Sequence, residues 1–278
     1  MSCPSGRSGL AHGEDQHTHR GLITVKEKIA SIITTLFIWG LAGALFGALF
    51  GGLYALLSSL GLAGWVPLVA AAAVAATTTS AFYSAMPVAL VGAMAGILAS
   101  IGYLIVVGPV VKLLGIAGIA GLGGVLAGLF YSWMVTGGGR PLAETLSGLL
   151  AGLFAGGCLA LTLAILGRDL DVFFMAAGVV ALVGTFFQIS ERWLVGHCAR
   201  WFPAVVSAAV VAGLIAAVVG ASVWIIGGAA SVMLGSQAEE VSNRILSVVP
   251  LGFLGGLCGG AVTGVMLRML GFRVGPLS

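Results

Sequence analysis

The chain has 278 residues, of which 59% are hydrophobic and 8% are charged, and its mean hydropathy is +1.15. Because a soluble domain carries about 25% charged residues, this chain cannot cover a globule with polar side chains. The net charge of +3 is too small to indicate nucleic-acid binding. The composition therefore excludes an ordinary soluble protein and indicates the lipid bilayer as the main partner.

The hydrophobic stretches predict helices rather than strands. A transmembrane β-barrel requires period-two alternation in segments of about ten residues, and the sequence has none. At about 20 residues per crossing, the part of the chain after Glu27 holds roughly seven to nine helices. We predict an all-α polytopic transmembrane bundle with about eight spans.

Residues 1–27 are polar and lack the apolar core and cleavage site of a secretory signal. We expect a disordered cytoplasmic tail. His12, His17 and His19 have metal-ligand chemistry, but a solvated tail offers no scaffold to fix them, so we predict no metal site. The four cysteines, Cys3, Cys158, Cys198 and Cys258, include no CxxC pair, and we expect no disulfide framework, no redox role and no cofactor.

Proline, charge and Gly-Ser positions divide the remaining chain into spans. In chain order the predicted spans are 30–57, 66–84, 87–108, 113–134, 145–166, 172–190, 204–230 and 248–269. Met86-Pro87 and Phe202-Pro203 mark helix starts, since proline suits the first turn. We expect a loop at 236–244. The first and seventh runs are long enough to tilt strongly or to contain a re-entrant piece, which leaves seven and nine crossings as alternatives.

The distribution of Lys and Arg favours eight spans with both termini in the cytoplasm of a cell with an inner, or plasma, membrane. Nine basic residues then lie inside and three outside, which is the asymmetry that the positive-inside rule expects. The inside set is Arg7, Arg20, Lys26, Lys28, Arg140, Arg192, Arg200, Arg268 and Arg273, and the outside set is Lys112, Arg168 and Arg244.

The first and second parts of the membrane region resemble each other. Residues 43–57 align with residues 148–162 at an offset of 105, with seven identities. Later spans align at larger offsets. We predict a tandem repeat of four plus four helices, with one half at 28–141 and the other at 142–278. Two parallel halves place any central pathway at their interface.

Glycines recur at four-residue spacing, which puts them on one helix face and lets two backbones approach closely. We predict helix packing, within the chain or between copies or other membrane subunits, at these glycine faces: Gly43, Gly47, Gly51, Gly148, Gly152, Gly156, Gly252, Gly256, Gly260 and Gly264. A narrow pathway lined by small residues is the alternative.

Ionisable side chains are nearly missing from the predicted spans, which argues against a proton relay or a voltage sensor. We interpret Glu191, Arg192 and Arg268 as residues near helix ends that snorkel to the interface. His197, in the expected loop WLVGHCARWF, we interpret as part of an interfacial anchor. The sequence has no HExxH or GxSxG motif, and we expect no enzymatic activity.

Uncharged polar residues within the second and sixth spans are the best candidates for a binding site. At the offset of 105, Ser80 aligns with Thr185 and Tyr83 with Gln188, beside Phe82 and Phe187. We hypothesise that a central cavity for a small, uncharged or weakly polar ligand is lined by Thr79, Ser80, Tyr83, Thr185 and Gln188. The alternative is that these side chains bond their own helix backbones.

Two functions of different classes follow. The first is a channel or permease for a small solute, with its pathway between the two halves. The second is a non-catalytic membrane subunit that scaffolds or binds partners, lipids or pigments in a larger complex.

Overall fold

The computed structural model describes residues 13–107, 113–134, 141–167, 170–198, 203–225 and 238–271. Within these ranges the protein is helical and contains no strand. The helices are α1 (Gly13–Ser59), α2 (Val66–Ser84), α3 (Met86–Val107), α4 (Leu113–Met134), α5 (Pro141–Leu166), α6 (Val172–Cys198), α7 (Ala204–Trp224) and α9 (Ala238–Met269). Each of these eight is long and apolar enough to cross a membrane, which confirms the predicted all-α bundle with eight spans.

Proline lies at the beginning of four of the described helices. Pro67 lies in the first turn of α2, Pro87 is the second residue of α3, Pro141 is the first residue of α5, and Pro203 is the N-cap of α7 with a φ of −58°. A proline lacks the backbone N–H that a first turn cannot use, and its φ already suits a helix. The boundaries inferred at Met86-Pro87 and Phe202-Pro203 are therefore where α3 and α7 begin.

Two segments that we expected to be irregular are helical. The tail expected to be disordered through Glu27 is part of α1 from Gly13 onward, and the loop expected at 236–244 is helical from Ala238. Polar composition misled the prediction, because a membrane helix can extend beyond the hydrocarbon with a polar surface. In α9 the first turn also carries Glu239 and Glu240, which the positive end of the helix dipole favours.

The sixth helix is also longer than predicted, since α6 continues to Cys198. His197 therefore lies in a helix and not in a loop. Cys3 and His12 lie outside the described residues.

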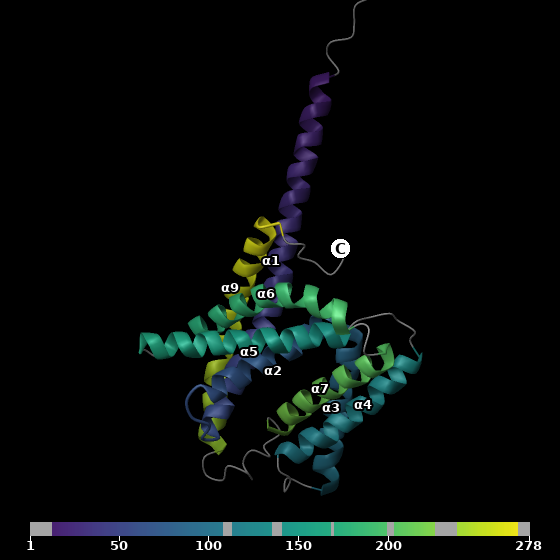
Figure 1. Ribbon diagram of the computed structural model, residues 1–278, viewed down its shortest axis with the longest axis vertical. Coiled ribbons are helices and arrows are strands. Elements are labelled where there is room, and N and C mark those ends of the chain that lie inside the picture. Colours follow the sequence, from purple (N-terminus) through teal and green to yellow (C-terminus); the bar gives the residue numbers. More distant parts are fainter. Residues whose placement is uncertain are drawn as a thin grey trace, which may run out of the picture.

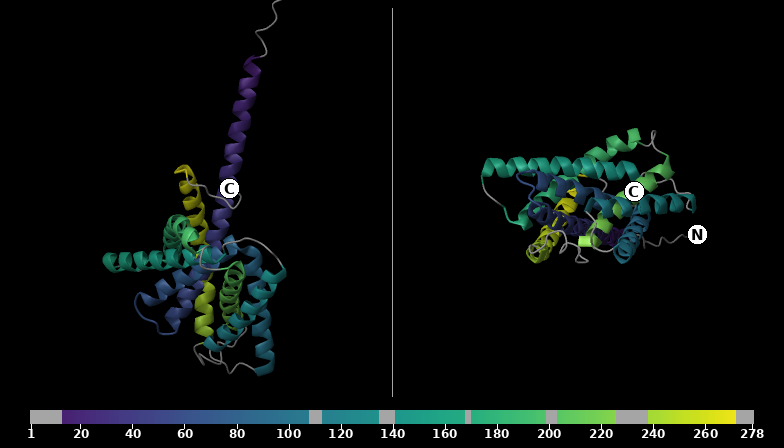
Figure 2. Two further views of the ribbon diagram at one scale, coloured as in Figure 1. Left: turned by 45° about the vertical axis from the view of Figure 1, so that its right-hand side comes forward. Right: turned by 90° about the horizontal axis from the view of Figure 1, so that it is seen from below.

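The eight helices form two groups (Figures 1 and 2). In the first, α1 lies antiparallel along α9, α6 packs against α9, and α2 packs between α1 and α5. In the second, α3 and α4 both pack against α7. α5 and α6 cross α1 and α9 steeply, and the N-terminal part of α1 extends beyond the other helices (Figure 1).

The two groups do not coincide with the predicted halves. The most extensive contact between helices is that of α1 with α9. In the predicted repeat α5 corresponds to α1 and α4 corresponds to α9, so α4 and α5 should make the same contact. Within the described ranges they make no comparable contact. The packing thus does not repeat between residues 28–141 and 142–278. A common origin of the two halves stays a prediction from sequence.

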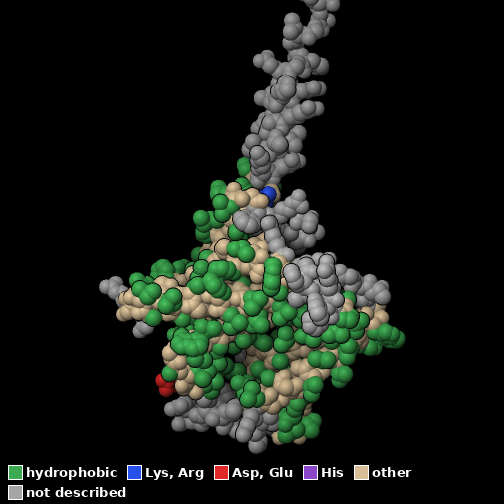
Figure 3. Space-filling view, viewed as in Figure 1, with side chains coloured by type: hydrophobic (Ala, Val, Ile, Leu, Met, Phe, Trp, Pro, Cys, Tyr) green, Lys and Arg blue, Asp and Glu red, His purple; other side chains and the backbone are tan. Residues whose placement is uncertain are grey.

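The outer surface is apolar, as lipid contact requires. Large side chains such as Val106 and Leu114 are 82% and 86% exposed, and hydrophobic side chains are spread over the described part of the face in Figure 3. A surface patch of this extent is incompatible with water. The acidic and basic atoms visible on that face lie at its opposite ends (Figure 3), as expected for a protein that spans a bilayer.

Candidate solute pocket between three helices

A cavity of about 80 Å³ lies between α1, α2 and α6. It is lined by Trp39, Ala42, Gly43, Phe46, Ala76, Thr79, Ser80, Tyr83, Val180, Val183, Gly184, Phe187 and Gln188. Since one water needs roughly 10–15 Å³ of such space, the cavity has room for several waters or for one small solute. Its helices come from both predicted halves of the chain, α1 and α2 from the first and α6 from the second.

Helical periodicity explains why these residues share a cavity. On α1 the lining residues are spaced by three, four and seven from Trp39, and α2 repeats that spacing from Ala76. On α6 the spacing from Val180 continues to Gln188. Residues at these intervals occupy one face of a helix, so three such faces meet at the cavity.

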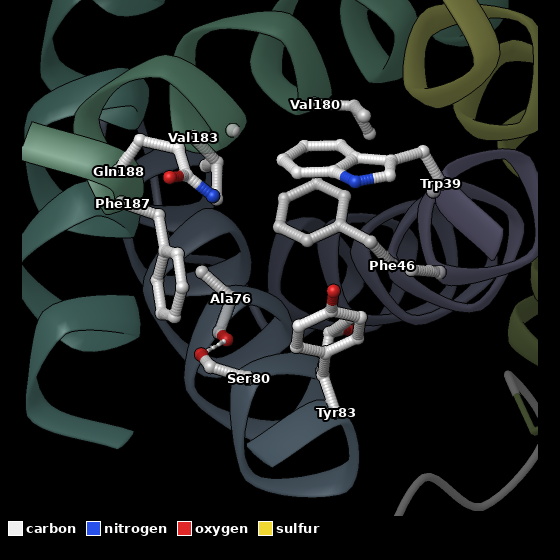
Figure 4. Close-up of a pocket in the computed structure, with 13 residues that line it drawn as sticks. Trp39, Phe46, Ala76, Ser80, Tyr83, Val180, Val183, Phe187 and Gln188 are labelled. Carbon is white, nitrogen blue, oxygen red and sulfur yellow. Dashed lines mark hydrogen bonds between the residues drawn. The ribbon is translucent and has the colours of Figure 1, made fainter. Parts of the chain in front are cut away.

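Two buried polar atoms of the lining residues have no hydrogen-bond partner. They are Nε1 of Trp39 and Oγ1 of Thr79. A buried polar atom without a partner costs about 1–3 kcal/mol. Both atoms belong to side chains that line the cavity. Figure 4 shows the side chains of Tyr83 and Gln188 reaching into the same space, with the rings of Trp39, Phe46 and Phe187 around it.

The remaining lining is apolar or already bonded. The Ser80 hydroxyl donates a hydrogen bond to the backbone oxygen of Ala76 (Figure 4). No described Asp, Glu, Lys, Arg or His lines the cavity. The pocket therefore presents a few uncharged polar groups in an aromatic and aliphatic surround, which is the usual composition of a small-molecule site.

The structure places four of the five residues of the hypothesised site at this cavity: Thr79, Ser80, Tyr83 and Gln188. Thr185 is the exception and corrects the hypothesis. Its side chain is exposed and its hydroxyl donates to the oxygen of Ala181 at 2.9 Å. Because each residue turns a helix by about 100°, Thr185 lies about 160° around α6 from Val183 and outside the face that lines the cavity.

The sequence analysis did not find the contribution of α1. Trp39 and Phe46 lie within a run that reads as ordinary lipid-facing helix, and the internal alignment compared only the second and sixth spans. The indole of Trp39 packs directly against Gly184, since a Cβ at Gly184 would lie 2.8 Å from the indole atom Cζ3. A glycine opposite an aromatic residue is the signal that would have pointed to this contact.

The predicted glycine faces meet other helices. A Cβ on Gly43 would lie 2.9 Å from Cα of Gly260, and one on Gly47 would lie 2.9 Å from Cα of Gly256. Along the same antiparallel contact Gly51 faces Gly252, and Gly264 receives the side chain of Trp39. This close backbone contact with α9 positions α1, which forms one wall of the cavity.

The second glycine face forms the contact between α5 and α2. A Cβ on Gly152 would lie 2.6 Å from the oxygen of Ala72, and one on Gly156 would lie 2.9 Å from Cα of Val69. Gly148 contacts Ser80 and Ala76. Through this contact α5 holds the helix that carries Thr79, Ser80 and Tyr83.

Most other hydroxyl groups in the spans bond their own helix. The oxygens four residues earlier accept from Thr34, Thr35, Thr77, Thr162, Ser222 and Thr263. Ser100 differs, since its Oγ donates across to the oxygen of Gly220 at 3.0 Å and joins α3 to α7.

In the part of the chain that the structure describes, no three His, Cys, Asp or Glu residues lie close enough to hold a metal ion. Comparison with protein-family models, with curated proteins and with solved structures finds no match for this chain.

Proposed function

We propose that this integral membrane protein is a channel or permease for a small, uncharged or weakly polar solute, and that the solute binds in the cavity between α1, α2 and α6 as it crosses the membrane. The proposal is non-enzymatic, because the cavity offers neither a nucleophile–base pair nor paired carboxylates. It also includes the orientation that the basic residues favour, with both termini on the cytoplasmic side of the plasma, or inner, membrane.

The observation that carries the proposal is the pair of unpartnered atoms, Nε1 of Trp39 and Oγ1 of Thr79. An indole N–H can only donate, whereas a hydroxyl can donate or accept. A molecule with one acceptor and one further polar atom would satisfy both. Without a fixed charge in the lining, an ion would lose its hydration and gain no counter-charge.

The test is permeability of proteoliposomes to glycerol, urea and formamide, measured by stopped-flow light scattering. We expect the wild-type protein to accelerate the uptake of at least one of them. Thr79→Val and Gln188→Leu should reduce that uptake several-fold, because they remove polar groups from the cavity. Thr185→Val, on the outer face of α6, is the matched control and should leave uptake unchanged.

Vesicles that contain folded wild-type protein but take up all three solutes at the rate of empty vesicles would contradict the proposal. An equal reduction of solute uptake in Thr185→Val and Thr79→Val would also contradict the proposal, since Thr79 lines the cavity and Thr185 does not.

A second candidate function is a non-catalytic subunit of a larger membrane complex. It is favoured by a shallow apolar groove between α4 and α7, where Gly115, Gly118 and Gly121 line the surface and a Cβ on Gly118 would meet nothing within 4 Å. A glycine such as Gly118, where an added Cβ would meet no other described helix, is suited to receive a helix of another chain. Size-exclusion chromatography of the detergent-purified protein, with mass spectrometry of co-purifying chains, tests this function.

A further inference from the structure

Arg268, in the last turn of α9, does not behave as a freely snorkelling side chain. Its Nη1 donates to the backbone oxygen of Ser31 at 2.8 Å and to Oγ1 of Thr35, and its Nη2 donates to Oγ of Ser31. Thr35 is buried, and its own hydroxyl donates to the oxygen of Ser31 at 2.8 Å. The guanidinium is therefore held in one orientation against α1.

Three of the five N–H donors of the guanidinium are used in these bonds. Both η nitrogens face Ser31. The N–H of Nε and the second N–H of Nη2 therefore lie on the neighbouring edge of the planar guanidinium. No described residue accepts a hydrogen bond from either of these two groups. Two parallel N–H groups on one edge are the arrangement that binds carboxylate or phosphate oxygens in pairs.

No carboxylate among the side chains that the structure describes forms an ion pair with Arg268. The surface around this contact is partly apolar. Ile32 and Leu36 follow Ser31 and Thr35 on α1, Met269 follows Arg268 on α9, and all three side chains are exposed. A fixed guanidinium beside apolar surface is costly unless an anion accompanies it.

The length of α9 places Arg268 at the depth of the lipid headgroups. Glu239 and Arg268 are 29 residues apart on this helix, or about 43 Å at 1.5 Å per residue. A bilayer measures about 40–45 Å with its headgroup regions included. When Glu239 and Glu240 lie in one headgroup region, Arg268 lies in the other.

From the open edge of the guanidinium, the absence of an ion pair with any described side chain and this depth, we propose that Arg268, oriented by Ser31 and Thr35, binds the phosphate of a phospholipid headgroup. The lipid tails lie against the apolar surface of α1 and α9 beside it. The bound lipid bridges the two helices whose contact forms one wall of the solute pocket, but the site is separate from that pocket and does not depend on its function.

Native mass spectrometry of the purified full chain tests this site. The probes, added separately to delipidated protein, are phosphatidylglycerol, a diacylglycerol with the same tails, and inorganic phosphate. We expect one phosphatidylglycerol to be retained by the wild type and about tenfold less by Arg268→Gln, because the neutral side chain lacks the charge and the paired donors. Arg268→Lys keeps the positive charge but lacks the paired N–H donors of the guanidinium, and it should retain several-fold less phosphatidylglycerol than the wild type.

Arg244→Gln is the matched control, since Arg244 is exposed near the other end of α9, and it should retain the lipid as the wild type does. Ser31→Ala should weaken retention several-fold while leaving the charge in place. Far-UV circular dichroism establishes that each variant is folded. Where Arg268→Gln does not fold, Arg268→Lys and Ser31→Ala carry the test.

Three results would overturn the proposal. The first is equal retention of phosphatidylglycerol by the wild type and the folded Arg268 variants. The second is equal retention of the diacylglycerol, which would assign binding to the tails alone. The third is binding of inorganic phosphate as tight as that of the lipid, which would make Arg268 a site for a soluble anion.

Discussion

Gly148, Gly152 and Gly156 lie on one face of α5, and each brings its backbone against α2. Because lipid tails are as apolar as leucine, helices in a bilayer gain little from hydrophobic burial and associate through close packing and hydrogen bonds. Single residues at close contacts therefore carry much of the stability. Their energetic effect depends on what lies opposite, which differs between glycines of the same helix.

Replacing Gly152 by leucine should destabilise the protein by about 1–3 kcal/mol or more, since even a Cβ would lie 2.6 Å from the oxygen of Ala72. The measurement is the folded yield and the thermal unfolding temperature in detergent. Gly157→Leu is the control on the same helix, because a Cβ at Gly157 meets nothing within 4 Å. Similar unfolding temperatures for both variants would show that the face of α5 with Gly152 merely contacts lipid.

Ser100 provides a test of a hydrogen bond between helices. Ser100→Ala removes the bond from its hydroxyl to the oxygen of Gly220 and should cost about 0.6 kcal/mol, the average for such bonds in membrane proteins. Ser222→Ala removes a bond within α7, to the oxygen of Val218, and should cost less. Chemical unfolding of both variants measures the difference, and a larger loss for Ser222→Ala would refute this assignment.

At the scale of elements, the contact between α1 and α9 brings together two helices from opposite ends of the described sequence. Their glycines pair in antiparallel register, with Gly43 beside Gly260 and Gly47 beside Gly256, so the first and last described helices lie together. Pro250 lies inside α9 and leaves one backbone oxygen of the preceding turn without its usual N–H partner. Such a position is where a membrane helix bends.

The register of α1 and α9 predicts a specific cross-link. A Cβ on Gly40 would lie 3.6 Å from Cβ of Ala261, within the separation that a disulfide requires. In a background without the four native cysteines, Gly40→Cys with Ala261→Cys should oxidise to an intramolecular disulfide, detected by mass spectrometry of the digested protein. The pair Gly40→Cys with Gly102→Cys should not, and a cross-link in that pair would indicate a different helix arrangement.

At the scale of the whole molecule, the even number of described spans places the N-terminal end of α1 and the C-terminal end of α9 at the same end of the bundle (Figure 1). We expect that end to lie in the cytoplasm, because nine basic residues would then lie inside and three outside.

Reporter fusions test the orientation. Fusions after Arg140 and Arg200 should report a cytoplasmic location, whereas fusions after Asp171 and Gln237 should report an external one. The reporters are alkaline phosphatase, active outside, and green fluorescent protein, fluorescent inside. A cytoplasmic signal after Gln237 would contradict the topology with eight spans.

The sequence by itself determined the solvent, the helical class and the positions of most spans, because hydropathy, helix length and proline act locally along the chain. It also indicated Thr79, Ser80, Tyr83 and Gln188, because the internal alignment at an offset of 105 sets polar residues of the second and sixth spans against each other. Only the tertiary structure decided that Trp39 and Phe46 join them, that Thr185 faces outward, and that Arg268 is held by Ser31 and Thr35. These outcomes depend on which helix faces meet, and Ala- and Gly-rich helices of nearly uniform hydropathy carry little information about their partners.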